Sequence, residues 1–200
     1  MKHEHPGTRS NMAINLQEAT GITEYLQLLH SINPASANNE LRKPDFTCIE
    51  QARIQDWHST AAWLLDIGKE FTHAIHAGEY ASRVNVSTPR QCYKNSTILA
   101  ELYPDLTYTE GYAFTGTIPL CITHAWCTTE NGAVVDPTWY DLDLSKASYY
   151  GIPMQLSFVR AVSLDTGLYG VLDSIWISKV ARNTPMREVL PLHKGCITTV

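Results

Sequence analysis

The segment that decides the fold is residues 120–140, which read LCITHAWCTTENGAVVDPTWY. Two runs of apolar and β-branched residues flank Asn131-Gly132 within it, and this pattern predicts a β-hairpin. His124 then lies on the first strand, and Asp136 lies on the second strand, antiparallel to the first. The pairing of the two strands decides whether these side chains share a face of the sheet.

The length of the hairpin loop sets that pairing. A two-residue loop pairs Cys127 with Asp136 and turns the aspartate away from His124. A three-residue loop over residues 130–132, with its glycine left-handed, pairs Trp126 with Asp136 and restores the common face, as a bulge also would. An interaction between His124 and Asp136 therefore predicts that the hairpin is not a plain two-residue turn.

A second stretch, residues 90–104, reads RQCYKNSTILAELYP and places Cys92 near the start of a helix. Thr88 as N-cap, followed by proline and by glutamine three residues later, predicts the helix start as a capping box, and Pro104 predicts an end near Leu102. Backbone N–H groups and the helix dipole favour a thiolate there. The alternative is a buried structural thiol, because cysteine is among the most buried residue types.

The remaining sequence predicts an α+β fold with an antiparallel sheet. Helical spacing of apolar residues predicts a helix over 16–30 and a longer one over 45–77, bent or divided at Gly68. Strand-like segments follow the Cys92 helix at 107–116, 120–129, 133–140 and 154–164. We expect a single domain made of a flexible arm (1–12), a helical N-terminal portion that includes a linker at 33–39 (13–82), a catalytic core (83–180) and a C-terminal tail or strap (181–200).

Charge and composition argue against several classes of function. The formal net charge of −5 argues against nucleic acid or an anionic membrane as the main partner. The start of the chain lacks the apolar segment of a signal peptide, and no apolar run reaches the ~18 residues of a membrane-spanning helix. The five cysteines (48, 92, 121, 127 and 196) have no C-x-x-C spacing, so we expect reduced thiols and a cytoplasmic protein.

Cys92, His124 and Asp136 together have the chemistry of an activated nucleophile. The imidazole can take the thiol proton, and the carboxylate can fix the orientation of the ring. Cys121, His124 and Cys127 form an alternative metal set, but alternation along a strand turns the histidine away from both cysteines. A core histidine bonded to the backbone is the other alternative. We expect no metal and no cofactor, and we expect the four other cysteines to be structural thiols.

Three segments in this order resemble the transglutaminase-like branch of the papain-type cysteine enzymes. They are residues 91–93 (QCY), 124–126 (HAW) and 134–138 (VVDPT). The intervals, 32 residues from Cys92 to His124 and 12 from His124 to Asp136, are similar to those of the family, including small phage and bacterial proteins with this core. The resemblance implies a nucleophile helix packed on an antiparallel sheet and preceded by N-terminal helices. Tyr93 stands where transglutaminases proper commonly carry tryptophan, so a peptidase, deamidase, amidase or acyltransferase fits the pattern as well.

The resemblance implies acyl transfer or amide hydrolysis through a thioester, on a protein, peptide or small amide substrate. The Cys92 N–H and the Gln91 side chain are candidate oxyanion donors. Further candidates to line the site are Asn95, which could instead bond within its helix, and Tyr112, Trp126 and Trp139. Two alternatives stay open. An arylamine-acetyltransferase-like enzyme would carry an Arg-Gly-Gly segment that residues 87–91 lack, and a non-catalytic binding module, such as a phage protein that captures a host partner, would use the fold without turnover.

Overall fold

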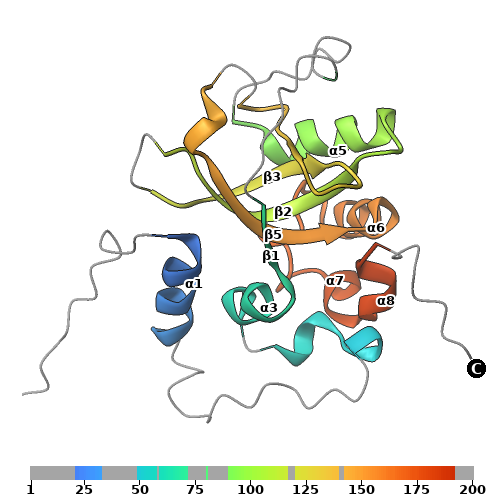
Figure 1. The fold of residues 1–200 in the computed structure, drawn as a ribbon. Coiled ribbons are helices and arrows are strands. Elements are labelled where there is room, and N and C mark those ends of the chain that lie inside the picture. The colour runs from blue at the N-terminus through green and yellow to red at the C-terminus, as the bar shows by residue number, and fades with distance from the viewer. Residues whose placement is uncertain are drawn as a thin grey trace, which may run out of the picture.

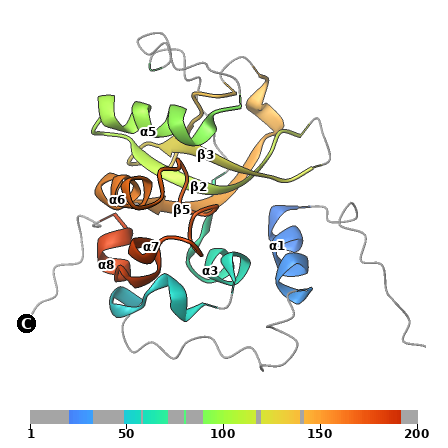
Figure 2. The same ribbon diagram turned by 180° about the vertical axis from the view of Figure 1, so that it is seen from behind.

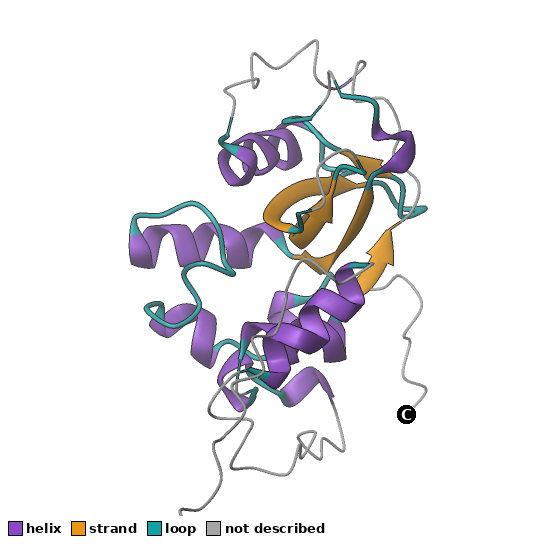
Figure 3. Cartoon of the chain, turned by 90° about the vertical axis from the view of Figure 1, so that its left-hand side faces the viewer, coloured by secondary structure: helices purple, strands orange, loops and turns teal. Residues whose placement is uncertain are grey.

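The computed structural model describes residues 21–32, 49–57, 59–71, 80, 90–116, 120–139 and 142–191. Its centre is a curled antiparallel sheet of five strands in the order β1-β5-β2-β3-β4 (Figure 1, Figure 3). The strands are β1 (Lys69–Phe71), β2 (Thr107–Phe114), β3 (Ile122–Thr128), β4 (Val134–Val135) and β5 (Ser148–Met154). The expected α+β class with an antiparallel sheet is confirmed.

Helices cover the sheet from two directions (Figure 2). The helix α5 (Cys92–Leu102) packs on β3 and β2, with α6 (Leu156–Thr166) beside it, and its end at Leu102 is the one predicted. The helices α1 (Ile22–Ser31) and α3 (Thr60–Ile67) pack on each other and on β5. The shorter elements are η2 (Ile49–Gln51), η3 (Ile54–Asp56), η4 (Leu144–Lys146), α7 (Lys179–Asn183) and α8 (Met186–Val189). None of the helices in the described ranges is both long enough and apolar enough to cross a membrane.

Each face of the sheet carries its own apolar cluster. The larger cluster joins Tyr108 and Cys127 of the sheet to Leu99 of α5 and Trp63 of α3. Full burial of a side chain such as Leu99 contributes about 1.5–3 kcal/mol relative to exposure. The smaller cluster lies on the opposite face and contains Phe71, Ala113, Trp126, Val134, Ala147 and Tyr149. His124 shares the face of the smaller cluster, because it lies two residues from Trp126 on β3.

Two glycines lie opposite each other in the middle of the sheet. Gly111 of β2 pairs with Gly151 of β5 and, on its other side, with His124 of β3. A Cβ on Gly111 would collide with the carbonyl oxygen of Tyr150, and a Cβ on Gly151 would collide with that of Glu110. Glycine at both positions therefore allows β2 and β5 to approach closely where the sheet curls, directly beside the histidine.

The region predicted as a long helix over 45–77 differs from the prediction. The described part has two single 3-10 turns, then α3, and Gly68 ends α3 as the predicted point of division. The predicted continuation of the helix directly beyond Gly68 is wrong, because residues 69–71 pair with β5 as β1. The predicted helical residues 45–48 and 72–77 lie outside the described residues. Apolar spacing in a run this short does not separate strand from helix, and pairing with β5 decides between them.

The strand predicted over 154–164 is also wrong. Met154 is the last residue of β5, and residues 156–164 belong to α6, in which Phe158, Val159 and Val162 are buried at the spacing of one helix face. The strand that precedes it, β5, was not predicted, because Gly151 and Pro153 disfavour a strand. The missing N–H of Pro153 is tolerated since the paired residues of β1 end opposite Gly151.

The two ends of the chain fall only partly within the described residues. The helix predicted over 16–30 is present as α1, while its first residues, the arm (1–12) and the linker (33–39) lie outside the described residues. After residue 180 the chain packs as a strap up to residue 191, with Ala181, Met186 and Val189 fully buried. The Gln155 N–H donates a hydrogen bond of 2.7 Å to the Val189 carbonyl and fixes this strap at the start of α6.

Candidate functional site

The hairpin between β3 and β4 has the three-residue loop that was predicted. The Thr129 N–H donates to the Ala133 carbonyl at 3.0 Å, and the strand pairing that follows places residue 136 opposite residue 126. Gly132 has a φ of 79°, the left-handed conformation in which glycine has no steric cost. This loop brings Asp136 to the face of His124.

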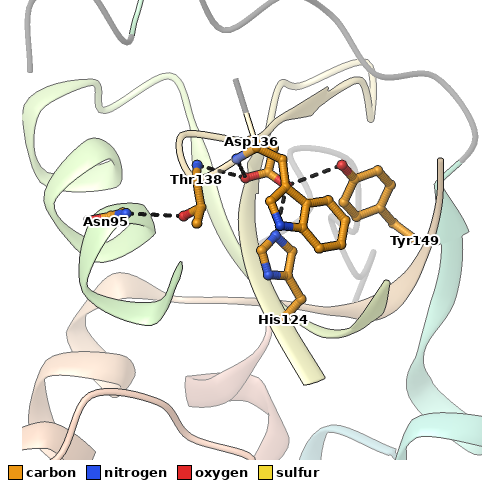
Figure 4. Close-up of polar contacts among 6 residues, drawn as sticks. Asn95, His124, Asp136, Thr138 and Tyr149 are labelled. Atoms are coloured by element: carbon orange, nitrogen blue, oxygen red, sulfur yellow. Dashed lines mark hydrogen bonds and ion pairs between the residues drawn. The ribbon is translucent and has the colours of Figure 1, made fainter. Parts of the chain in front are cut away.

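His124 and Asp136 form a buried pair. The Nε2 atom of His124 lies 2.7 Å from Oδ2 of Asp136 (Figure 4). The two residues are 2% and 0% exposed, so water does not compete for the interaction. Because Nε2 is engaged by the carboxylate, Nδ1 is the ring nitrogen left to face another group.

Three further donors satisfy the Asp136 carboxylate. The backbone N–H groups of Thr138 and Trp139 donate to Oδ1 at 2.8 and 3.0 Å, and the Tyr149 hydroxyl donates to Oδ2 at 3.1 Å (Figure 4). Burial, and then the charge of Asp136, raise the pKa of Tyr149, which therefore stays a neutral donor. With its donors in place, the carboxylate can hold the imidazole in one orientation.

Two tryptophans flank the histidine, as predicted. The ring of Trp139 stacks on His124 with centroids 4.0 Å apart and an interplanar angle of 15°, and Trp126 lies 6.3 Å away at 20°. Trp126 is fully buried. These rings exclude water from the His124–Asp136 pair, and a dry surrounding strengthens its electrostatic interaction.

Cys92 is the first residue of α5 and lies within hydrogen-bonding reach of His124. It is a free thiol with partial exposure, so a reagent or substrate can approach it. The pairing of His124 Nε2 with Asp136 leaves Nδ1 for the thiol. The imidazole thus contacts the Asp136 carboxylate and interacts with the Cys92 thiol, which raises the pKa of His124.

Three opposing influences set the pKa of His124. Burial lowers it, whereas the charge and hydrogen bond of Asp136 raise it, and the contact with Cys92 raises it further. The result is a pKa raised from 6.5 to about 9, so the imidazole is protonated at neutral pH. A protonated imidazole beside the sulfur can stabilise a negative charge there.

The start of α5 differs from the sequence prediction. The helix begins at Cys92 with Gln91 as N-cap, and the side chain of Gln91 makes no capping hydrogen bond. Arg90 has a φ of 67°, which no α-helix accommodates, so the predicted start of the helix at residue 89, three residues before Cys92, is wrong. Thr88 lies outside the described residues. The exposed Gln91 amide is therefore not used as a helix cap, and the Cys92 N–H is the first unpaired donor of the helix.

Asn95 links α5 to the loop that carries Asp136. Its Nδ2 donates to Oγ1 of Thr138 at 3.1 Å (Figure 4). This hydrogen bond joins the amide to the loop and is not a bond within α5. Tyr112 points to the other face of the sheet from His124 and packs edge-on against Tyr25, with centroids 5.5 Å apart. The structure therefore brings Asn95 to the Asp136 loop and does not bring Tyr112 to the histidine.

The sequence prediction missed Tyr149 and Thr138, which both donate hydrogen bonds to the Asp136 carboxylate. Tyr149 lies on the strand that was not predicted. Thr138 had a usable signal, because an aspartate before a turn commonly accepts the N–H of the second residue after it, as Asp136 does here.

The two other cysteines in the described ranges, Cys121 and Cys127, are not bonded to His124. The Cys127 thiol donates to the Ser96 carbonyl at 3.3 Å inside the larger cluster, and Cys121 is a half-exposed free thiol. Cys48 and Cys196 lie outside the described residues. Within the described ranges, no group of three or more histidine, cysteine or acidic side chains could hold a metal ion. Comparison of the chain with family models, with curated proteins and with solved structures found no match.

Proposed function

We propose that this protein is a cysteine-dependent acyltransferase or amide hydrolase that works through a thioester. The observation that carries the proposal is the buried His124–Asp136 pair, whose Nε2–Oδ2 distance is 2.7 Å, with the half-exposed Cys92 beside the imidazole. A core histidine with only a structural role would have no need of a half-exposed thiol on its second nitrogen.

The reaction follows from the order of these groups. The Cys92 sulfur, its proton held on His124, attacks the carbonyl carbon of an amide. The C–N bond breaks as His124 returns the proton to the leaving nitrogen, and the acyl group remains on sulfur as a thioester. Water or a second amine then gives a proton to His124 and attacks the thioester, and the C–S bond breaks to release the acid or the new amide.

The oxyanion formed in each step needs hydrogen-bond donors. The Cys92 N–H at the start of α5 is one candidate, because the first N–H groups of a helix have no intrahelical acceptor. The Gln91 side chain is the second candidate, since it is exposed and makes no capping hydrogen bond. The left-handed conformation of Arg90 costs about 1–3 kcal/mol for a residue with a Cβ. Such strain two residues before a nucleophile is consistent with a site built for chemistry.

We extend the proposal to the protein family and to the cellular compartment in which the reaction takes place. The helix bearing Cys92, packed on an antiparallel sheet that carries His124, supports a transglutaminase-like core of the papain type. The substrate would be a protein, a peptide or a small amide. We place the reaction in the cytoplasm, because the three described cysteines are free thiols and such thiols persist in reducing compartments.

Alkylation by iodoacetamide at neutral pH tests the proposal. Peptide mass spectrometry would follow the labelling rate of Cys92 and compare it with that of Cys121, a half-exposed free thiol that serves as an internal control. We expect Cys92 to react about tenfold faster or more, and His124→Ala to remove this difference. Equal rates at the two cysteines in the wild-type protein would rule out the nucleophile assignment. Loss of a substrate-modifying activity in Cys92→Ala would then separate an enzyme from a binding module.

A further inference from the structure

A second buried carboxyl group lies on the opposite face of the sheet from His124. Glu110 of β2 is fully buried, one residue before the glycine that pairs with His124. Its Oε1 accepts hydrogen bonds from the Tyr108 hydroxyl at 2.5 Å and the Val171 N–H at 2.6 Å, and its Oε2 accepts one from the Leu172 N–H at 2.8 Å. Within the described part of the chain, it forms no ion pair with a cationic side chain.

Two of these donors belong to the loop that follows α6. Gly167 and Gly170 both have positive φ, 73° and 99°, so the loop turns sharply on either side of residues 168 and 169. Gly170 lies against the ring of Tyr93, where an added Cβ would come within 3.2 Å of ring carbons. Tyr93 directly follows Cys92 in α5. Residues 170–172 thus bridge the Glu110 carboxyl and the first turn of the helix that carries the thiol.

We propose that Glu110 is a positioning residue for Cys92, because its carboxylate holds residues 170–172 against Tyr93 and so fixes the first turn of α5. This inference rests on the proposed function, since only there does the orientation of the Cys92 sulfur matter. Hydrogen bonds from backbone N–H groups to a charged carboxylate are roughly twice as strong as those to a neutral acceptor. The hydrogen bonds from Val171 and Leu172 to Glu110 are therefore strongest when Glu110 is ionised.

The charge of Glu110 changes in the neutral range. Burial raises the pKa of Glu110 from 4.5 to about 7, although the Leu172, Tyr108 and Val171 hydrogen bonds lower it, and the charge of Asp173 raises it slightly further. The titratable groups that face it are Tyr108 on β2, Tyr93 on α5 and Asp173 on the loop. Burial raises the pKa of both tyrosines, so they stay neutral near pH 7, where Glu110 changes charge.

The test compares Glu110→Gln with the wild-type protein. The readout is the rate of iodoacetamide labelling at Cys92 from about pH 5.5 to about pH 9, given as the ratio of wild type to variant. The ratio removes the pH dependence of labelling that the two proteins have in common. Glu101→Gln is the matched control, because it removes a carboxylate from α5 that is exposed and bonded to Arg160 at 2.8 Å.

We expect a ratio of about three to ten above pH 8 that falls towards one below about pH 6, where wild-type Glu110 is itself neutral. The ratio for Glu101→Gln should stay near one throughout. A ratio of one at every pH would show that Glu110 has no role in positioning Cys92. A raised ratio that does not vary with pH would show that Glu110 acts only through packing, which would also overturn the proposal. Failure of the proposed function is seen separately, as wild-type Cys92 that labels no faster than Cys121.

Labelling of Cys127 reports whether Glu110→Gln still folds, since this thiol is fully buried in the native protein. If the variant unfolds, amide hydrogen exchange in the wild-type protein replaces it. The Val171 and Leu172 hydrogen bonds lower the pKa of Glu110, so they favour its ionised form as long as the sheet keeps it buried. For local opening of the loop, the protection factors of these two amides should therefore fall as pH drops through about 7, although the global free energy of unfolding rises. Protection that stays constant across this range would contradict the proposal.

Discussion

Tyr149 donates its hydroxyl to the same carboxylate oxygen of Asp136 that binds His124, at 3.1 Å and 2.7 Å respectively. The tyrosine comes from β5 and the histidine from β3, so the aspartate joins strands that are not neighbours in the sheet. The position of the imidazole thus depends on the packing of the whole smaller cluster as well as on the β3–β4 hairpin.

Replacement of Tyr149 by phenylalanine removes one donor and keeps the ring. We expect the free energy of unfolding to fall by about 1 kcal/mol, because three donors to Asp136 remain and a net hydrogen bond contributes about that much. Urea denaturation measures the change. Tyr150→Phe is the matched control on the same strand, since Tyr150 lies on the other sheet face, and it should leave stability nearly unchanged. Equal losses in both variants would contradict a specific contribution of the hydroxyl.

Replacement of Asp136 by asparagine keeps the shape of the side chain and removes its charge. The pKa of His124 should then fall, because the charge of Asp136 is the main influence that raises it. We expect Cys92 labelling at neutral pH to slow about tenfold or more. Titration of the His124 ring by NMR checks the cause, and an unchanged histidine pKa would show that Asp136 does not govern the pair.

Stability should fall as pH rises through two windows. Glu110, with its pKa raised from 4.5 to about 7, and His124, raised from 6.5 to about 9, both bind their proton more tightly in the folded state. Their contributions are therefore complete below the unfolded-state pKa and are lost as pH rises through the folded-state pKa, each on the order of 1–3 kcal/mol.

Variants assign each window to its residue. Urea denaturation at a series of pH values should show that Glu110→Gln flattens the decline between about pH 4.5 and 7, and that His124→Ala flattens the decline between about 6.5 and 9. A decline that persists in both variants would assign the slope to other groups.

Two single-residue deletions test the hairpin register. Deletion of Glu130 leaves a two-residue Asn-Gly turn and keeps residue 136 opposite residue 126, so Cys92 labelling should persist. Deletion of Ala133 keeps a three-residue loop but moves Asp136 opposite Cys127, which turns it away from His124. We expect this second deletion to reduce Cys92 labelling about tenfold or more. Similar labelling in the two deletion variants would show that the register does not matter.

The His124–Asp136 pair could be predicted from sequence because it depends on short-range features. Asn131-Gly132 locates the turn, and the alternation of side chains then leaves only the loop length to decide. Tyr149 could not be predicted, since β5 contains Gly151 and Pro153 and becomes a strand only through pairing with β1 and β2.

The start of α5 shows a different limit of sequence reasoning. Threonine, proline and glutamine around residue 90 form a sound local signal for a helix start. The helix nevertheless begins at Cys92, after Arg90 in a left-handed conformation that its own side chain disfavours. Only contacts with distant parts of the fold can impose such a conformation, and no local pattern encodes them.

The opposed glycines of β2 and β5 restrict which substitutions the sheet can accept. At Gly111 and Gly151 only hydrogen atoms separate the two backbones, so even alanine would have to push the strands apart. Most buried positions accept a change of shape if neighbouring side chains rearrange, but here the nearest atoms belong to the backbone, and the buried Trp126 ring also lies against Gly151. In a library that randomises the sheet, selection for folded protein would retain glycine at both positions. His124, which lies beside them, would then stay buried whatever residues surround it.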